Sequence, residues 1–184
     1  MKRIAAVLII GVLVALPMKT GDSKSLGESL VKPGGSPPVI THSFASEELS
    51  HGDIWKIYLE AHDPDGDMRQ FVCAFTQVGY GPYSSEYVII KKRHRERMKG
   101  YLIFPSYVGD RLSEWTQLSL TIYIRDKGGN TSNKVVFPLV FSRGAKQGTP
   151  PPPFDIGDLD KLGTIPVELI DPQRGNGNGD EREP

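Results

Sequence analysis

The stretch WKIYLEAHDPDGDMRQFVCAF, Trp55–Phe75, decides the fold class of this chain. Apolar side chains occupy every second position of its first part: Trp55, Ile57, Leu59 and Ala61. This period of two is typical of a strand with one buried face. In the last part, Phe71, Cys73 and Phe75 share one face and Val72 and Ala74 the other, so we expect a central strand with both faces covered.

The five residues between these strands, Asp63–Asp67, predict a tight turn. Pro64 presets φ for the second position of a type I turn, Asp63 can accept hydrogen bonds from the following backbone, and Gly66 tolerates a positive φ. The stretch therefore predicts strand, turn and strand.

Further strands follow the same reasoning. Leu118–Ile124 and Val135–Phe141 alternate cleanly, and shorter apolar runs lie at Val39–Phe44, Glu86–Lys92 and Gly100–Tyr107. We expect Glu86–Lys92 and Gly100–Tyr107 to form a hairpin with the basic run at its tip. Together these strands predict an all-β immunoglobulin-like β-sandwich of about seven antiparallel strands over residues 38–143.

Two motifs resemble a known family. Ala61 with Asp63–Asp67 forms the pattern A-x-DPDGD, and the loop of LTIYIRDKGGNTSNKVVFPLVF carries Asp126, Gly129, Asn130 and Ser132. Both are similar to bacterial extracellular immunoglobulin-like domains of the PKD and cadherin-like kind. The resemblance covers about a hundred residues and implies a seven-stranded sandwich. It departs where the family has an aromatic strand and a Gly-Asp-Gly turn, because this chain has FTQVGYGPYSSEY.

The N-terminus predicts export. Lys2 and Arg3 precede the apolar run Ile4–Leu16, which is shorter than a membrane-spanning helix. We interpret residues 1–20 as a signal peptide or an uncleaved anchor and residues 21–37 as a linker. The expected location is periplasmic, cell-surface or secreted, with membrane contact only through an uncleaved N-terminal segment.

The C-terminal region predicts a linker, a docking segment and a tail. Residues 144–153 end in four prolines and read as an extended linker. Residues 154–170 hold enough apolar side chains for one docking strand, which we place at Thr164–Ile170. Docking on the chain's own domain would make the segment a latch, and docking on a neighbour would make it an assembly arm. Residues 171–184 should form a disordered tail.

Calcium is the candidate ion for the acidic turn, and no other cofactor is expected. Asp63, Asp65 and Asp67, together with Asp126 or Asn130, offer the oxygen ligands that calcium prefers. The alternative is ordinary turn chemistry, because Asp, Pro and Gly favour turns without any ion.

A basic run is the candidate partner-binding surface. It contains six basic residues and one acid, Glu96; the basic residues are Lys91, Lys92, Arg93, Arg95, Arg97 and Lys99. Such a run suits a polyanion or an acidic protein partner, and the alternative is a solvated hairpin tip. A third interpretation is contact with the acidic residues of Asp155–Pro184, within one chain or between chains. The net charge of the whole chain is zero, so we expect no nucleic-acid partner.

The sequence contains no recognisable catalytic motif. The four histidines lack metalloprotease spacing, and no nucleophile elbow is present. Cys73 is the single cysteine, and we expect it to be a buried hydrophobe. The favoured function is therefore a non-enzymatic binding or structural module of the cell envelope that acts through a protein partner. The alternatives are a carbohydrate-binding or accessory module, for which clustered exposed tyrosines (Tyr80, Tyr83, Tyr87 and Tyr107) would be the mark, and an enzyme whose site the sequence hides.

Overall fold

The alternating stretches form the strands of the structure. A computed structural model describes residues 35–106, 116–155, 157 and 159–169. The stretch Trp55–Phe75 forms a strand on either side of the acidic turn, as its pattern predicts. In chain order the elements of the described residues are β1 Val39–Ala45, β2 Glu48–Leu49, β3 Ile54–His62, β4 Met68–Gln77, β5 Gly81–Pro82, β6 Glu86–Ile89, the 3-10 helix η1 Lys92–His94, β7 Arg97–Pro105, β8 Gln117–Asp126, β9 Val135–Phe141 and β10 Asp160–Thr164.

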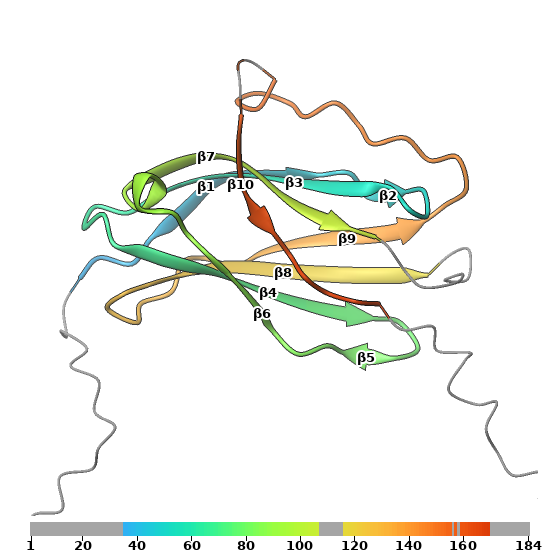
Figure 1. Cartoon of the computed structure of the whole chain (residues 1–184), viewed down its shortest axis with the longest axis horizontal. Coiled ribbons are helices and arrows are strands. Elements are labelled where there is room, and N and C mark those ends of the chain that lie inside the picture. The colour runs from blue at the N-terminus through green and yellow to red at the C-terminus, as the bar shows by residue number, and fades with distance from the viewer. Residues whose placement is uncertain (1–34, 107–115, 156, 158, 170–184) are drawn as a thin grey trace, which may run out of the picture. The chain divides into compact units, whose positions relative to one another are not determined.

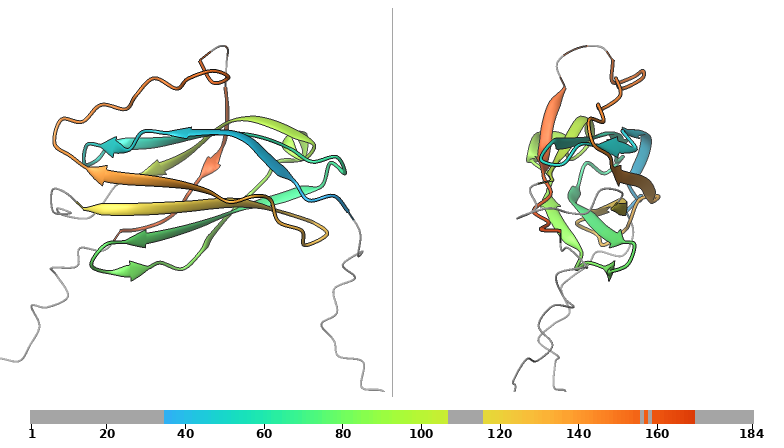
Figure 2. Two further views of the ribbon diagram at one scale, coloured as in Figure 1. Left: turned by 180° about the vertical axis from the view of Figure 1, so that it is seen from behind. Right: turned by 90° about the vertical axis from the view of Figure 1, so that its right-hand side faces the viewer.

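These strands lie in two sheets that face each other (Figure 1). Sheet A has the order β1-β3-β7-β10, and sheet B has the order β2-β9-β8-β4-β5, with β6 also pairing with β4. β3 and β4 belong to different sheets, so the acidic turn carries the chain from one layer to the other, and the end-on view in Figure 2 shows both layers. This arrangement is an immunoglobulin-like β-sandwich, which confirms the predicted fold class.

Two pairings depart from the predicted antiparallel pattern. β2 lies parallel to β9, and β10 lies parallel to β7. The other named strand pairs are antiparallel. A parallel pair needs a long connection between its strands. For β7 and β10 that connection includes the two long strands β8 and β9 and the linker after them.

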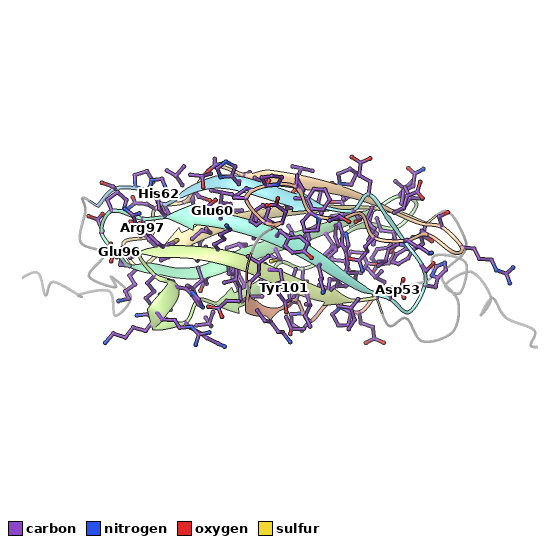
Figure 3. All side chains as sticks on the ribbon, turned by 90° about the horizontal axis from the view of Figure 1, so that it is seen from above. Asp53, Glu60, His62, Glu96, Arg97 and Tyr101 are labelled. Atoms are coloured by element: carbon purple, nitrogen blue, oxygen red, sulfur yellow. The ribbon has the colours of Figure 1, made fainter. Side chains whose placement is uncertain are left out.

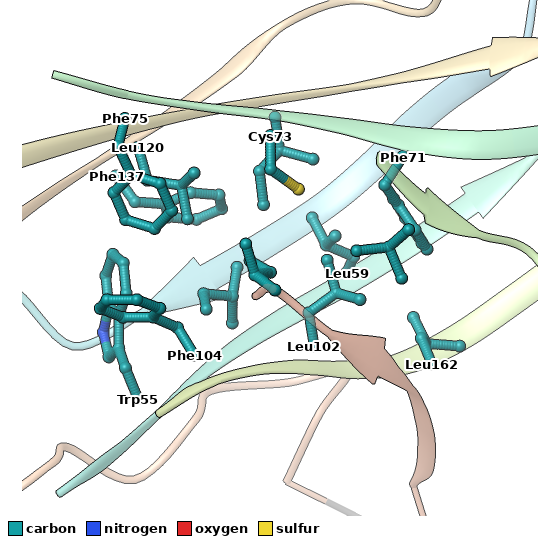
Figure 4. Packing of buried hydrophobic residues seen from close by; sticks show 14 of the residues in the cluster. Trp55, Leu59, Phe71, Cys73, Phe75, Leu102, Phe104, Leu120, Phe137 and Leu162 are labelled. Atoms are coloured by element: carbon teal, nitrogen blue, oxygen red, sulfur yellow. The ribbon is translucent and has the colours of Figure 1, made fainter. Parts of the chain in front are cut away.

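The core lies between the inner faces of the sheets (Figure 4). Trp55 is fully buried and makes edge-on contacts with Phe104 and Phe137, each at 6.4 Å between ring centroids. Its indole N–H donates to the carbonyl oxygen of Ser46 at 2.8 Å, so its one polar atom is satisfied. Cys73 is buried in the same cluster, and burial raises the pKa of its thiol to about 12, as expected for a structural cysteine.

The segment after β9 leaves sheet B and crosses the outer side of sheet A before it reaches β10 (Figure 1, orange to red). The side-chain amide of Gln147 donates to the carbonyl oxygen of Ile54 at 2.7 Å and accepts from the backbone N–H of Lys56 at 3.0 Å. Further along, Phe154 is buried against the ring of Tyr58, with 5.7 Å between centroids. These contacts fix the route of the linker across β3.

Several predicted segments lie outside the described residues: the signal or anchor segment 1–20, most of the linker 21–37, Tyr107 and the tail 171–184. Within the part that the structure describes, no helix has the length and apolar character needed to cross a bilayer.

Candidate functional site

Three carboxylates meet at one end of the sandwich. The turn between β3 and β4 supplies Asp63 and Asp67, and the end of β8 supplies Asp126. One carboxylate oxygen from each of the three lies within 4.8 Å of the others, and Asp63 and Asp126 are only 1% and 3% exposed. A hard cation that takes several oxygen ligands fits such a group.

Backbone hydrogen bonds hold two of these carboxylates in place. Asp63 accepts from the backbone N–H of Asp65 at 3.1 Å and of Asp67 at 3.3 Å, while Gly66 adopts the positive φ that the turn requires. Asp126 accepts from the backbone and side-chain amides of Asn130 at 2.8 and 2.9 Å. Turn chemistry therefore explains Asp63 and Asp126 without an ion.

Asp67 is the member of the acidic cluster that turn chemistry leaves unexplained. Its Oδ1 atom is buried and has no hydrogen-bond partner among the described residues. Burial raises the pKa of this carboxyl, and the hydrogen bond to Asp63 and the charges of Asp126 and Asp63 raise it further. The charge of Lys127 opposes these effects but does not outweigh them, so the ionised form of Asp67 is disfavoured.

Asp65, the middle residue of the predicted ligand set, has another role. Its carboxylate accepts a hydrogen bond from the backbone N–H of Ser36. Asn130 also reaches this entry segment, because its amide donates to the carbonyl oxygen of Gly35 at 3.5 Å. The structure thus brings Asp63 and Asp67 together with Asp126, and it places Asp65 where the chain enters the sandwich.

The basic run does not lie at a hairpin tip, so the predicted hairpin is wrong. β6 pairs with β4 in sheet B, whereas β7 pairs with β3 in sheet A. The residues between them, 90–96, form a crossover between the layers that contains η1. The physical reason is that each strand of the expected hairpin finds a better partner in an earlier part of the chain.

The crossover divides the basic residues into two groups. Lys91, Lys92 and Arg93 are exposed around η1, and Arg95 is half-buried behind them. Arg97 and Lys99 instead belong to β7, where they lie opposite His62 and Glu60 of β3. Figure 3 shows Glu60, His62 and Arg97 gathered on the outer face of sheet A. These residues and His42, which pairs with Glu60 at 3.0 Å, line a shallow hollow.

The C-terminal segment docks on the chain's own sandwich. β10 pairs with β7 through Asp160 opposite Gly100 and Thr164 opposite Ile103, and the backbone N–H of Ile165 donates to the carbonyl oxygen of Ile103 at 2.9 Å. The buried side chains of this segment that join the core are Leu162, Ile165 and Leu169. The strand is therefore Asp160–Thr164 and not the predicted Thr164–Ile170. Pro166, which has no amide to donate, follows the last of these backbone bonds.

Close contacts fit β10 to its neighbours. A Cβ atom at Gly100 would collide with the carbonyl oxygen of Asp160, and one at Gly163 would collide with the side chain of Val88 in β6. A glycine is needed at both positions because the backbones and Val88 approach so closely.

A basic corner holds the start of β10. The carboxylate of Asp160 lies 3.4 Å from Nη2 of Arg93 and 3.4 Å from Nε2 of His94. Burial lowers the pKa of His94, the charges of Arg93 and Lys91 lower it further, and only Asp160 opposes them. The Nε of Arg93 donates to Nε2 of His94 at 3.0 Å, which is consistent with a neutral imidazole.

The tyrosines predicted to cluster lie in two places. Tyr80 and Tyr83 have ring centroids 5.0 Å apart beside a groove, which Glu86 and Glu168 also line. Tyr87 lies on the outer face of sheet B, where its register partner is Val72 of β4.

This outer face of sheet B is apolar at its centre. Val72 is only 1% exposed although it points away from the core, and it lies in register between Tyr87 and Tyr123. The outer face of β4, which we expected to be covered, is therefore shielded at Val72 by its register neighbours Tyr87 and Tyr123. Ile89 and Val136 extend the same surface and are largely exposed.

Comparisons with known proteins give no family for this chain. No family model matches it, and no curated protein matches it. Solved structures that are similar to parts of it include two domains from archaea. One is the PKD domain of an M14-like peptidase from the Thermoplasmatales archaeon SCGC AB-540-F20, with 14% identity, a TM-score of 0.38, and coverage of 60% of this chain and 100% of that one. The other is a CARDB domain from Pyrococcus furiosus, solved in complex with di-metal ions, with 7% identity, a TM-score of 0.32, and coverage of 59% and 96%.

Proposed function

We propose that this protein is an exported, non-catalytic module that binds another protein of the cell envelope through the outer face of sheet B. The observation that carries the proposal is the apolar centre of that face, where Tyr87 and Tyr123 flank the buried Val72. Protein interfaces are depleted of charge at their centres and enriched in tyrosine. Export is supported by Lys2, Arg3 and the apolar run Ile4–Leu16.

The outer faces of the two sheets differ in how many charged side chains they carry. In sheet B, Arg69 and Arg125 lie near one end of β4 and β8, and Glu48 lies on the edge strand β2. Lys134 reaches the centre of the face, where its Nζ lies 5.6 Å from the centroid of the Tyr123 ring in a cation–π contact. The outer face of sheet A is crossed by the linker and carries a row of titratable groups: His42, Lys56, Glu60, His62, Arg97 and Lys99. Sheet B is therefore the face that loses least on desolvation by a partner.

The basic residues have a secondary part in this proposal. Lys91, Lys92 and Arg93 at η1, with Arg95, Arg97 and Lys99 beyond them, suit an acidic region of the same partner. Exposed charges of this kind change the association rate more than the affinity. We also assign a structural calcium to Asp63, Asp67 and Asp126, supported by the unpartnered Oδ1 atom of Asp67.

Site-specific photo-cross-linking in intact cells tests the proposal. A photoreactive residue at Thr121 or Val136 samples the outer face of sheet B, and one at Lys56 samples the outer face of sheet A as a matched control. We expect a discrete cross-linked protein from the first pair only, lost again when Tyr123→Ser is added. Equal cross-linking from Lys56, or none from sheet B, would refute the assignment of this face.

A carbohydrate-binding module is the second candidate function. It is favoured by the groove in which the paired rings of Tyr80 and Tyr83 lie beside Glu86 and Glu168, since sugars bind aromatic faces and carboxylate acceptors. Titration calorimetry with soluble oligosaccharides tests it. Binding that disappears in Tyr80→Ala and persists in Tyr87→Ala would support this candidate, and an absence of heat would remove it.

A further inference from the structure

The edge of β7 from Gly100 to Ile103, together with Val88 of β6, forms a slot that receives the C-terminal segment. We call residues 154–169 the strap. The contacts between the slot and the described part of the strap are backbone pairing, apolar packing and one acidic contact. The slot lies on the edge of sheet A, so its occupation by a strap is independent of the function proposed for the outer face of sheet B.

The slot is selective for the sequence of the strap. An acidic residue suits the first position, because the carboxylate of Asp160 lies 3.4 Å from the guanidinium of Arg93. A large aliphatic residue follows at Leu162, and then glycine, because any side chain at Gly163 would collide with Val88. A second copy of this chain carries the same segment and therefore meets these requirements.

The linker allows the strap to reach such a copy. Between β9 and β10 the described residues lack strand or helix, and extended chain with this proline content spans about 3.1 Å per residue. Among the described residues, the contacts that fix its route are made by Ala145 with Ser50, Gln147 with β3, Gly148 with Ser46 and Phe154 with Tyr58. The pairing of strap and slot itself does not depend on which chain the strap comes from.

We infer that two copies of this chain join by exchanging straps, so that β10 of each lies in the slot of the other. The exchanged dimer keeps the contacts between strap and slot and gives up the contacts of Gln147 and Gly148 with β3 and Ser46. Its population is therefore governed by concentration, since a tethered segment experiences an effective concentration in the millimolar range. Monomers prevail in dilute solution, and dimers form where copies are crowded.

Two full-length variants test separately whether a chain can donate its strap and whether it can accept one. Gly100→Ala closes the slot and leaves the strap intact, because the added methyl group meets the carbonyl oxygen of Asp160. Leu162→Asp spoils the strap and leaves the slot intact, because it brings a charge into the core. Each variant alone should be monomeric. Their mixture should form a one-to-one heterodimer, visible by native mass spectrometry and accompanied by a rise in melting temperature.

The double variant Gly100→Ala/Leu162→Asp is the matched control, because it can neither give nor receive a strap. It should pair with neither single variant. Absence of a heterodimer up to millimolar concentration, with both single variants folded by circular dichroism, would overturn the inference. If either variant fails to fold, isotope-labelled and unlabelled wild-type chains are mixed at millimolar concentration instead. Mixed dimers are then expected, and only monomers would overturn the inference.

Discussion

Replacing Leu162 by alanine tests whether the strap stabilises the sandwich. The side chain is 3% exposed and belongs to the core cluster. Leu→Ala at buried sites costs about 2–5 kcal/mol. We expect the lower half of this range, about 2–3 kcal/mol, because a terminal segment can relax around the missing atoms more easily than a central strand.

The matched control is Ile89→Ala, which removes the same number of carbon atoms from a side chain that is 61% exposed. Substitutions at such positions usually change stability by less than about 0.5 kcal/mol. For a folded unit of this size, 1 kcal/mol corresponds to roughly 3–5 °C in Tm, so Leu162→Ala should lower Tm by about 10 °C.

Urea unfolding followed by circular dichroism measures both variants, with hydrogen exchange at the amides of Gly100–Ile103 as a local probe. The variant should lose stability and exchange faster at the slot. If Leu162→Ala stays within about 0.5 kcal/mol of Ile89→Ala, the strap does not stabilise the folded state and the reasoning from its burial fails.

Three other predictions concern titratable groups. Asp67→Asn should raise Tm in calcium-free buffer at pH 7, because the carboxyl of Asp67 has a raised pKa and its ionised form is disfavoured. Millimolar calcium should raise Tm of the wild type and leave that of the variant unchanged; at a calcium concentration of ten times Kd the gain in the free energy of unfolding is about 1.4 kcal/mol. A wild type whose Tm does not respond to calcium would contradict the assigned ion. Cys73, with a thiol pKa of about 12, should react with a disulfide reagent only as the protein unfolds, and a reaction that precedes unfolding would disprove its burial. The pKa of His94 is lowered in the folded state, so the unfolded state binds the proton more readily, and stability should fall as pH drops below about 6.5 toward the lowered value. His94→Gln should flatten this dependence between pH 7 and 5, and an unchanged slope would assign it to other groups.

Local pattern predicted the strands well. The alternation around Trp55 and the turn at Asp63–Asp67 correctly predicted β3 and β4, because burial on one face imposes a period of two. Pattern says nothing about which strands pair. The expected hairpin around the basic run failed for this reason, since β6 and β7 each pair with an earlier strand in a different sheet.

The C-terminal strand shows the limit of propensity. β-branched residues favoured Thr164–Ile170, yet the strand that forms contains Lys161 and Gly163. Strand preference depends on the surface against which a segment packs. Here Gly100 makes room for the backbone of Asp160, and Val88 leaves no room for a side chain at Gly163. The fit becomes visible only when these distant parts of the chain are brought together.

The acidic cluster was predictable in part. Asp63 and Asp67 follow from the turn motif, and the second motif supplied Asp126 as an additional ligand. Asp65 could not be separated from them by sequence, because its role depends on Ser36, which lies 29 residues earlier.

The long sequence separation between β7 and β10 affects how the protein is made. Sixty residues separate Gly100 from Asp160, its register partner. At a synthesis rate of about 5–20 residues per second, the edge of β7 leaves the ribosome roughly 3–12 s before the strand that covers it. During this interval the nascent chain exposes the apolar side chains that Leu162 and Ile165 will later bury.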